Sequence, residues 1–418
     1  MAEATKQYVV DGVTKRTYFR PEHKVIDLPD LVGHLKSSWR KMVDSDLGDI
    51  FSEVNPIDDY TGEKLSLSFK DYHFGEPKIS DKEAIRDNAD YTAPLYANVE
   101  LVNRTTGEVK EQELYLGEYP WMTDRGTFVV NGSERVIISQ LIRSNGVYFD
   151  AEQVGDQRYY GARIMPSRGA WFQFETDSHG VIWVRIDRRR KMPVTTLLRA
   201  LGYSTNTAIN ELFAKTNHGE VDYIKETIAK ESSRTTNEAL IDVFQRLRPG
   251  DLATVENARQ MIERSFFDFK RFDMGKVGRY KLNRRLDNIK KDLGMPTGLA
   301  ETNENRVLLL DDLVAIINEI IRLNNTQEPA DDIDAFYNRR VRLVGELVAR
   351  QFRVGLLRLE RNIRDRMTVA DLATVTPAQL INARPIVAAV REFFASSQLS
   401  QYMEQENPIA ELSHRRRL

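Results

Sequence analysis

Acidic and basic side chains are concentrated in one short stretch of the sequence. Asp331, Asp332 and Asp334 precede the adjacent pair Arg339 and Arg340. Carboxylates that converge on a divalent metal ion can activate water, so one hypothesis is a metal-dependent nuclease or phosphatase. The alternative is structural, because acids ahead of a helix also bond to local arginines and free backbone N–H groups. Structural ion pairs often imitate active sites, so the residue types alone favour this second interpretation.

The composition and motifs give little support to other kinds of catalytic site. The chain has 418 residues and no cysteine, which excludes disulfides, zinc knuckles, iron–sulfur clusters and cysteine nucleophiles. Its six histidines are scattered without metal-ligand spacing, and no G-x-S-x-G motif marks a serine nucleophile. The glycines of residues 275–283 fit neither common phosphate-binding pattern, so we predict a turn-rich connection there.

Nucleic-acid contact requires arginine or lysine for phosphates, bidentate groups for base edges and aromatic rings for stacking. Arg143, Trp171, Asp334 and Arg339 are of these types but lie far apart in the sequence. The formal net charge is −2, which argues against a simple polycationic binder. The cationic run 188–191 is interpreted as a solvated loop. Residue type alone favours structural roles, since a strand tryptophan usually belongs to the core.

The elements that must position these residues follow from periodicity and turn signals. The length favours two or three domains, and the pattern favours an α+β fold. Residues 117–150 predict strands joined by tight turns at 123–126 and at Asn131 and Gly132, and residues 171–186 predict another hairpin. Helical periodicity then dominates residues 203–330, and a long amphipathic helix is expected over 344–367. No apolar leader or window of about 20 apolar residues is present, so we expect a cytoplasmic protein.

Three long motifs extend the argument beyond composition. The segment GEYPWMTDRGTFVVNGSERVIISQLIRSNGVYF resembles an N-terminal segment of the bacterial RNA polymerase β subunit. DDID followed by NRRVRLVGELVARQFRVGLLRLER, and NARPIVAAVREFFASSQLSQYMEQENP followed by ELSHRRRL, resemble two later segments of that subunit in the same order. The resemblance extends from about residue 20 to the end of the chain.

The resemblance implies a β-rich protrusion with helices and a mixed lobe inserted into it. The protrusion would comprise residues 20–134 and 344–400, and the lobe residues 135–343. Residues 401–418 would begin the fork and rifamycin-pocket region. The family continues beyond the position of Leu418, so we expect a truncated or split subunit.

The resemblance also assigns roles to residues of three surfaces. Family positions that contact the non-template DNA strand correspond to Arg143, Trp171, Ile333, Asp334 and Arg339. Inhibitor-contact positions of the rifamycin pocket correspond to Arg135, Ile138, Gln401, Tyr402, Glu404, His414 and Arg417. A patch on which transcription-repair coupling and similar factors dock corresponds to Val109, Lys110 and Glu111.

Several positions depart from the family pattern. Ile142 and Asn145 replace the usual His and Pro, and residues 335–337 read Ala-Phe-Tyr in place of His-Leu-Gly. Tyr402 and Glu404 stand where Phe and Asp are common, and both changes add bulk.

The implied function is that of one part of a DNA-directed RNA polymerase, a nucleotidyltransferase. The chain would form one wall of the DNA channel and contact the non-template strand and the RNA–DNA hybrid, with β′, α, ω and σ subunits as partners and no membrane. It would act in the cytoplasm, associated with the nucleoid. The Mg²⁺ ions would be held by β′, so no catalytic residue or bound cofactor is expected here, and the chain alone should be inactive. The alternatives are a binding-only module that docks transcription factors and the carboxylate nuclease.

Overall fold

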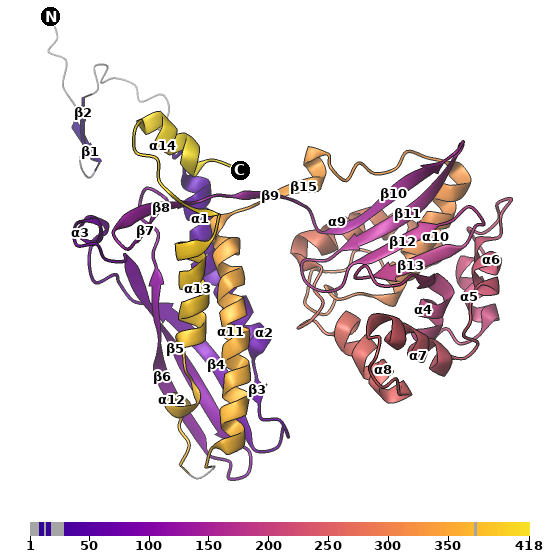
Figure 1. The fold of residues 1–418 in the computed structure, drawn as a ribbon, viewed down its shortest axis with the longest axis horizontal. Helices are drawn as coiled ribbons and strands as arrows, with labels where there is room; N and C mark the ends of the chain where they lie inside the picture. Colours follow the sequence, from indigo (N-terminus) through magenta and orange to yellow (C-terminus); the bar gives the residue numbers. More distant parts are fainter. Residues whose placement is uncertain (1–7, 12–13, 18–28, 372–373) are drawn as a thin grey trace, which may run out of the picture. The chain divides into compact units, whose positions relative to one another are not determined.

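The computed structural model describes residues 8–11, 14–17, 29–371 and 374–418. The chain forms two compact units, one from residues 1–140 and 343–418 and the other from residues 141–342 (Figure 1). The second unit is therefore a continuous segment inserted into the first. This confirms the predicted α+β class with an inserted domain. The chain changes units after residues 140 and 342, whereas the family resemblance implied changes after residues 134 and 343.

The first unit is built around an antiparallel sheet in the order β3-β4-β5-β6. Its strands are β3 (Ile57–Asp58), β4 (Leu65–Phe74), β5 (Thr92–Asn103) and β6 (Val109–Pro120). A smaller sheet has the order β16-β8-β7 and contains β7 (Phe128–Val130), β8 (Ser133–Ile137) and β16 (Ser400–Tyr402). The strands β1 (Tyr8–Asp11) and β2 (Thr14–Thr17) pair with each other in a separate antiparallel sheet. The Asn131 and Gly132 turn connects β7 to β8 as predicted, and both residues have positive φ.

Helices of the first unit pack against its four-stranded and three-stranded sheets. They are α1 (Gly33–Lys41), α2 (Leu47–Val54), α3 (Asp81–Arg86), α11 (Val344–Val369), α12 (Pro377–Leu380), α13 (Arg384–Ser396) and α14 (Pro408–Arg415). In Figure 1, α11 and α13 lie side by side. Their close approach depends on Gly355, since an added Cβ would lie 2.5 Å from the Cα of Ile386. Leu67, Val99 and Phe352 belong to the core beneath these helices.

The second unit contains an antiparallel meander of five strands in sequence order. These are β10 (Gly146–Val154), β11 (Gln157–Met165), β12 (Phe172–Thr176), β13 (Ile182–Ile186) and β14 (Met192–Pro193). A separate two-stranded pair, β9 (Gln140–Arg143) and β15 (Arg339–Arg342), brings together the two ends of the inserted segment. The strand that ends at Arg143 therefore lies beside the strand that begins at Arg339.

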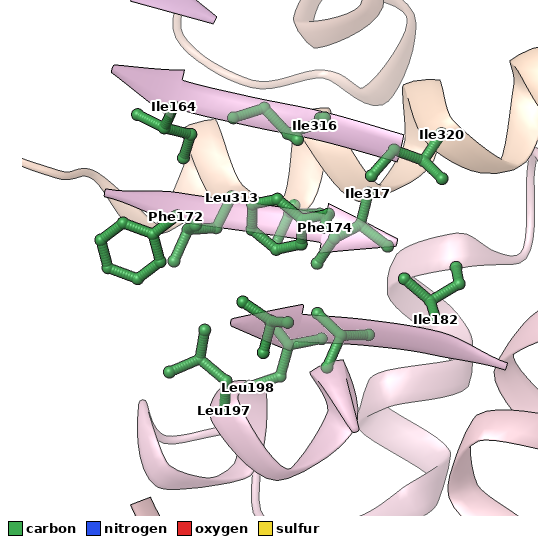
Figure 2. Close-up of a cluster of buried hydrophobic side chains, with 14 of the residues drawn as sticks. Ile164, Phe172, Phe174, Ile182, Leu197, Leu198, Leu313, Ile316, Ile317 and Ile320 are labelled. Atoms are coloured by element: carbon green, nitrogen blue, oxygen red, sulfur yellow. The ribbon is translucent and has the colours of Figure 1, made fainter. Parts of the chain in front are cut away.

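Seven α-helices of the described residues pack with this meander. They are α4 (Val194–Ala200), α5 (Asn206–Phe213), α6 (Tyr223–Ala229), α7 (Thr236–Leu247), α8 (Val255–Ile262), α9 (Gly275–Leu293) and α10 (Leu310–Thr326). Figure 2 shows Ile316 and Ile320 of α10 against the sheet residues Phe174 and Ile164, with Leu197 of α4 nearby. The apolar face of α10 is thus buried.

The predicted turn-rich connection over residues 275–283 is wrong, because this segment is the first half of α9. Leu282 and Leu286 recur at helical spacing and are fully buried, which gives the segment an apolar face. Gly278 permits close packing, since an added Cβ would lie 3.0 Å from the Cβ of Asn145. No helix in the described ranges combines the length and apolarity needed to span a bilayer.

Candidate nucleic-acid interface

Three side chains from the two ends of the inserted segment form an exposed ion cluster. Arg143 Nε and Nη2 donate to Asp334 Oδ1 over 3.1 Å each, and Nη2 also donates to Oδ2 over 3.2 Å. Arg339 Nη2 donates to Asp334 Oδ1 over 2.9 Å. The exposed side-chain fractions are 43% for Arg143, 56% for Asp334 and 34% for Arg339. One carboxylate therefore holds two guanidinium groups at the surface, and all three residues were predicted to contact DNA.

Backbone pairing and a tight turn hold this cluster in place. Arg143 ends β9 and Arg339 begins β15, which pairs with β9. Ser144 N donates to Asn338 O over 2.8 Å, and the Asn338 side-chain amide donates to Asp332 O over 2.6 Å. The turn that carries Asp334 is therefore fixed to the end of β9 by main-chain as well as side-chain bonds.

The pKa of Asp334 is lowered from its ordinary value. The largest cause is the hydrogen bond from Arg339, followed by the bond from Arg143. Both interactions favour the ionised carboxylate. The carboxylate is consequently charged at neutral pH and fixes both arginines near one point.

Trp171 lies at the same end of the meander as the beginning of β10. The registers pair Gly146 with Met165 and Phe172 with Ile186, so Trp171 stands one residue beyond the last paired row of β12. The backbone N–H of Trp171 donates to Asp187 Oδ1 over 2.9 Å, and 47% of the residue is exposed. The ring is therefore accessible, unlike that of a core tryptophan. Ile333, the fifth predicted contact, is partly buried in the turn that precedes Asp334.

The structure adds residues that the sequence did not assign to this region. Phe336 and Tyr337 lie between Asp334 and Arg339 and are 86% and 74% exposed. The run 188–191 is exposed as predicted, and it follows Asp187, the backbone partner of Trp171. The departure of residues 335–337 from the family pattern is a signal that could have indicated Phe336 and Tyr337. The register of the 171–186 hairpin could have indicated the run 188–191.

The three aspartates of this segment have different partners. Asp331 Oδ2 accepts from Phe149 N over 2.9 Å, and Asp332 Oδ1 accepts from Asp334 N over 3.0 Å. Asp334 is held by the two arginines. Within the described ranges, no group of three or more His, Asp or Glu side chains is arranged to hold a metal ion. The arrangement matches the structural interpretation of these acids and gives no support to a carboxylate nuclease.

The predicted inhibitor-contact residues lie around β8, β16 and α14 in the first unit. Arg135 and Tyr402 are cross-strand partners, and the Arg135 guanidinium carbon lies 4.3 Å from the centroid of the Tyr402 ring. Arg135 Nη1 also donates to Phe394 O over 3.2 Å. Ile138 is buried in a small cluster with Val136 and Met403. Their role toward an inhibitor stays a prediction.

His414 connects the remaining members of this group. Glu404 N donates to His414 Nδ1 over 3.3 Å, so Nδ1 is the accepting nitrogen, and Nε2 faces Gln401 Oε1 at 3.1 Å as a donor. Burial lowers the pKa of His414, and the nearby charge of Arg417 lowers it further. The imidazole is therefore a neutral structural link between α14 and the segment that follows β16. Arg417 itself is exposed.

The predicted factor-docking residues lie on β6, an edge strand of the four-stranded sheet. Val109 is 52% exposed and Glu111 is also exposed. Because successive side chains of a strand point to opposite faces, the Lys110 side chain lies on the other face, where its Nζ donates to Val375 O over 3.1 Å. The three consecutive residues therefore do not share one face.

Comparison with known proteins shows which proteins the chain is similar to. Residues 143–342 match the family model described as RNA polymerase Rpb2, domain 2, which corresponds to the inserted unit. The chain is also 46% identical over 407 residues to the DNA-directed RNA polymerase subunit beta of Syntrophomonas wolfei, covering 97% of this chain and 35% of that protein. The corresponding subunit of Renibacterium salmoninarum is 42% identical over 447 residues, covering 98% of this chain and 37% of that protein.

These matches confirm the predicted resemblance. Residues 143–342 match the model of Rpb2 domain 2, and over nearly its whole length the chain is similar to bacterial RNA polymerase β subunits. It spans about a third of the length of the curated relatives that it matches.

Proposed function

We propose that this chain forms one wall of the DNA channel of a DNA-directed RNA polymerase and contacts the non-template strand. The observation that carries this proposal is the exposed cluster in which Asp334 holds Arg143 and Arg339 together. Half-exposed Trp171 lies at the adjoining end of the meander. Ile333 supplies an apolar surface in the same turn.

The cluster is suited to an unpaired base next to a phosphate. Its bonds to Asp334 use Nε and Nη2 of Arg143 and Nη2 of Arg339. Each guanidinium has five N–H donors in all, so donors remain for phosphate or base-edge acceptors. The Asp334 carboxylate can accept from an exocyclic amine, and an exposed tryptophan ring offers a stacking surface. Phosphates would supply affinity and base edges selectivity.

Binding of single-stranded oligonucleotides tests this proposal on the 418-residue chain. Arg143→Ala and Arg339→Ala should each weaken binding. Each should also reduce the magnitude of the slope of log K against log salt concentration, by about 0.7 for each phosphate that the variant no longer neutralises. Arg248→Ala is the matched control, since Arg248 forms an exposed ion pair with Asp251 elsewhere in the same unit. Equal affinity and equal salt dependence in all three variants would refute the proposed contact.

We propose no catalytic role for any residue of this chain. Template-directed synthesis would require the Mg²⁺ held by β′, together with the α, ω and σ subunits, and the chain alone would be inactive. In the assembled enzyme it would also contact the nascent RNA–DNA hybrid, and it would work in the cytoplasm at the nucleoid. Robust RNA synthesis by the purified chain with template, NTPs and Mg²⁺ would contradict this.

A second proposed role is docking of a transcription factor at the edge of β6. The supporting observation is that β6 ends the sheet order and carries exposed Val109 and Glu111. An edge strand presents unpaired backbone groups to which an incoming strand can be added. Pull-down of a transcription-repair coupling factor should fail with Val109→Pro, since proline removes a backbone donor, while Val154→Pro at the exposed end of β10 should leave the interaction intact. Loss with both variants or with neither would contradict docking at this edge.

A further inference from the structure

The outward face of the larger sheet in the first unit carries a row of three aromatic rings. His73, Tyr96 and Tyr115 are direct cross-strand partners on β4, β5 and β6. The His73 and Tyr96 rings stack with centroids 5.3 Å apart, and the Tyr96 and Tyr115 centroids are 5.7 Å apart. The first and last members are exposed, Tyr115 to 53%. The row is therefore a continuous aromatic surface across three strands.

Acidic side chains surround this row on the same face. Strand alternation places Glu113 and Glu111 on the same face as Tyr115 on β6, and Glu100 on the same face as Tyr96 on β5, opposite Glu111. A groove with a cavity volume of 540 Å³ lies along these glutamates, beside the aromatic row, and is lined by Glu100, Glu111 and Glu113 together with Asn98, Asp71 and Lys70. Carboxylates outnumber cations along it.

Two of these carboxylates lack a cationic partner among the described residues. Lys70 pairs with Glu100 over 3.0 Å, whereas Glu113 faces only the imidazole of His73 at 3.8 Å. Glu111 forms no ion pair with a residue of the described ranges. The face therefore combines accessible aromatic rings with uncompensated negative charge.

Cross-strand aromatic pairs also stabilise a sheet by themselves, which would explain the stacking alone. It would not explain why the adjoining carboxylates are unpaired. A single-stranded nucleic acid could use such rings, but the carboxylates would repel its phosphates. A guanidinium group fits both features, because it stacks on aromatic faces and binds carboxylates in a bidentate manner.

We propose that this face, formed by His73, Tyr96, Tyr115, Glu111 and Glu113, binds an arginine-containing segment of a protein partner. Arginine side chains of that segment stack on the tyrosine rings and pair with the two glutamates. The proposal is independent of the DNA contact. It also differs from strand addition at the β6 edge, because it depends on side chains of the sheet face rather than on main-chain bonds.

Fluorescence anisotropy with the 418-residue chain tests the proposal. The probes are a labelled peptide of alternating arginine and glycine, the same peptide with lysine in place of arginine, and oligothymidylate. The arginine peptide should bind most tightly. Tyr115→Leu and Glu113→Gln should each weaken its binding by about three- to fivefold, whereas Tyr115→Phe should retain it, since the stacking ring remains.

Tyr280→Leu is the matched control, because Tyr280 is 55% exposed in the other unit. Thermal unfolding of each variant verifies that the sheet is intact. The proposal is overturned if Tyr115→Leu binds the arginine peptide as tightly as Tyr280→Leu does. It is also overturned if lysine and arginine peptides bind equally, or if oligothymidylate is the preferred probe and its binding disappears with Tyr115→Leu.

Discussion

At the scale of single residues, Asp334 determines the geometry of the proposed DNA contact. Arg143 and Arg339 come from sequence positions almost two hundred residues apart, and each donates to the same carboxylate. Two adjacent guanidinium groups would repel each other without it. The aspartate therefore acts as a positioning residue, and in the proposed contact it also accepts from a base.

The first prediction concerns the titration of Asp334. Because its folded-state pKa is lowered, the stability that it contributes is present above the ordinary aspartate range and is lost as pH falls through the folded-state pKa. Arg339→Gln should raise the titration midpoint measured by carboxyl NMR, and Arg143→Gln should raise it by a similar or smaller amount. An unchanged midpoint in both variants would show that the ion cluster does not form in solution.

Residue types alone identified this site only in part, and the family resemblance supplied the rest. The aspartates and arginines of residues 331–340 were visible as a local cluster, but nothing local indicates that Arg143 completes it. The contact of Lys110 was also hidden, because it joins residues far apart in the sequence. Strand alternation turns the Lys110 side chain toward Val375 O.

At the scale of elements, strands and turns were predicted better than close packing. Asn131 and Gly132 predict their own turn, since both tolerate positive φ. In contrast, α9 was missed because its glycines suggest a loop when considered locally. Gly278 is instead a point of close approach to Asn145, which is a tertiary property that no local propensity encodes.

The second prediction tests such close approach between α11 and α13. Alanine at position 355 should improve helix propensity by about 1 kcal/mol, yet its Cβ would lie 2.5 Å from the Ile386 Cα. We expect overpacking to dominate, so that Gly355→Ala lowers the free energy of unfolding by about 1–3 kcal/mol.

Chemical denaturation of the 418-residue chain measures this change. Gly48→Ala is the control on α2, because its Cβ would make an ordinary 3.5 Å contact with Tyr72. That variant should be neutral or slightly stabilised. Stabilisation by both substitutions would mean that the helices can separate without cost.

At the scale of the whole molecule, the inserted unit has the properties of an independent domain. Residues 141–342 are continuous, their ends are paired as β9 and β15, and they contain their own core. The resemblance to a polymerase subunit indicated this insertion, whereas the length of the chain predicted only that it has two or three domains. The boundaries follow from strand pairing, because β8 pairs with β16 and so keeps residues 135–137 in the first unit.

The third prediction follows from this independence. Residues 141–342 expressed alone should unfold in one cooperative transition and keep the ion cluster, because the cluster lies entirely within this unit. Circular dichroism and the Asp334 titration measure the two properties. A gradual, non-cooperative melt would show that the unit depends on the remainder of the chain.

The most direct test of the proposed DNA contact places Arg339→Ala in a complete polymerase whose β subunit contains this sequence. Dissociation is measured from four templates that differ in one non-template base at the downstream edge of the bubble. If Arg339 contacts a base edge, the variant should lose about 1–3 kcal/mol of discrimination among the four bases, whereas Arg248→Ala should retain it. Equal weakening on all four templates, or no change on any, would contradict base recognition by this cluster.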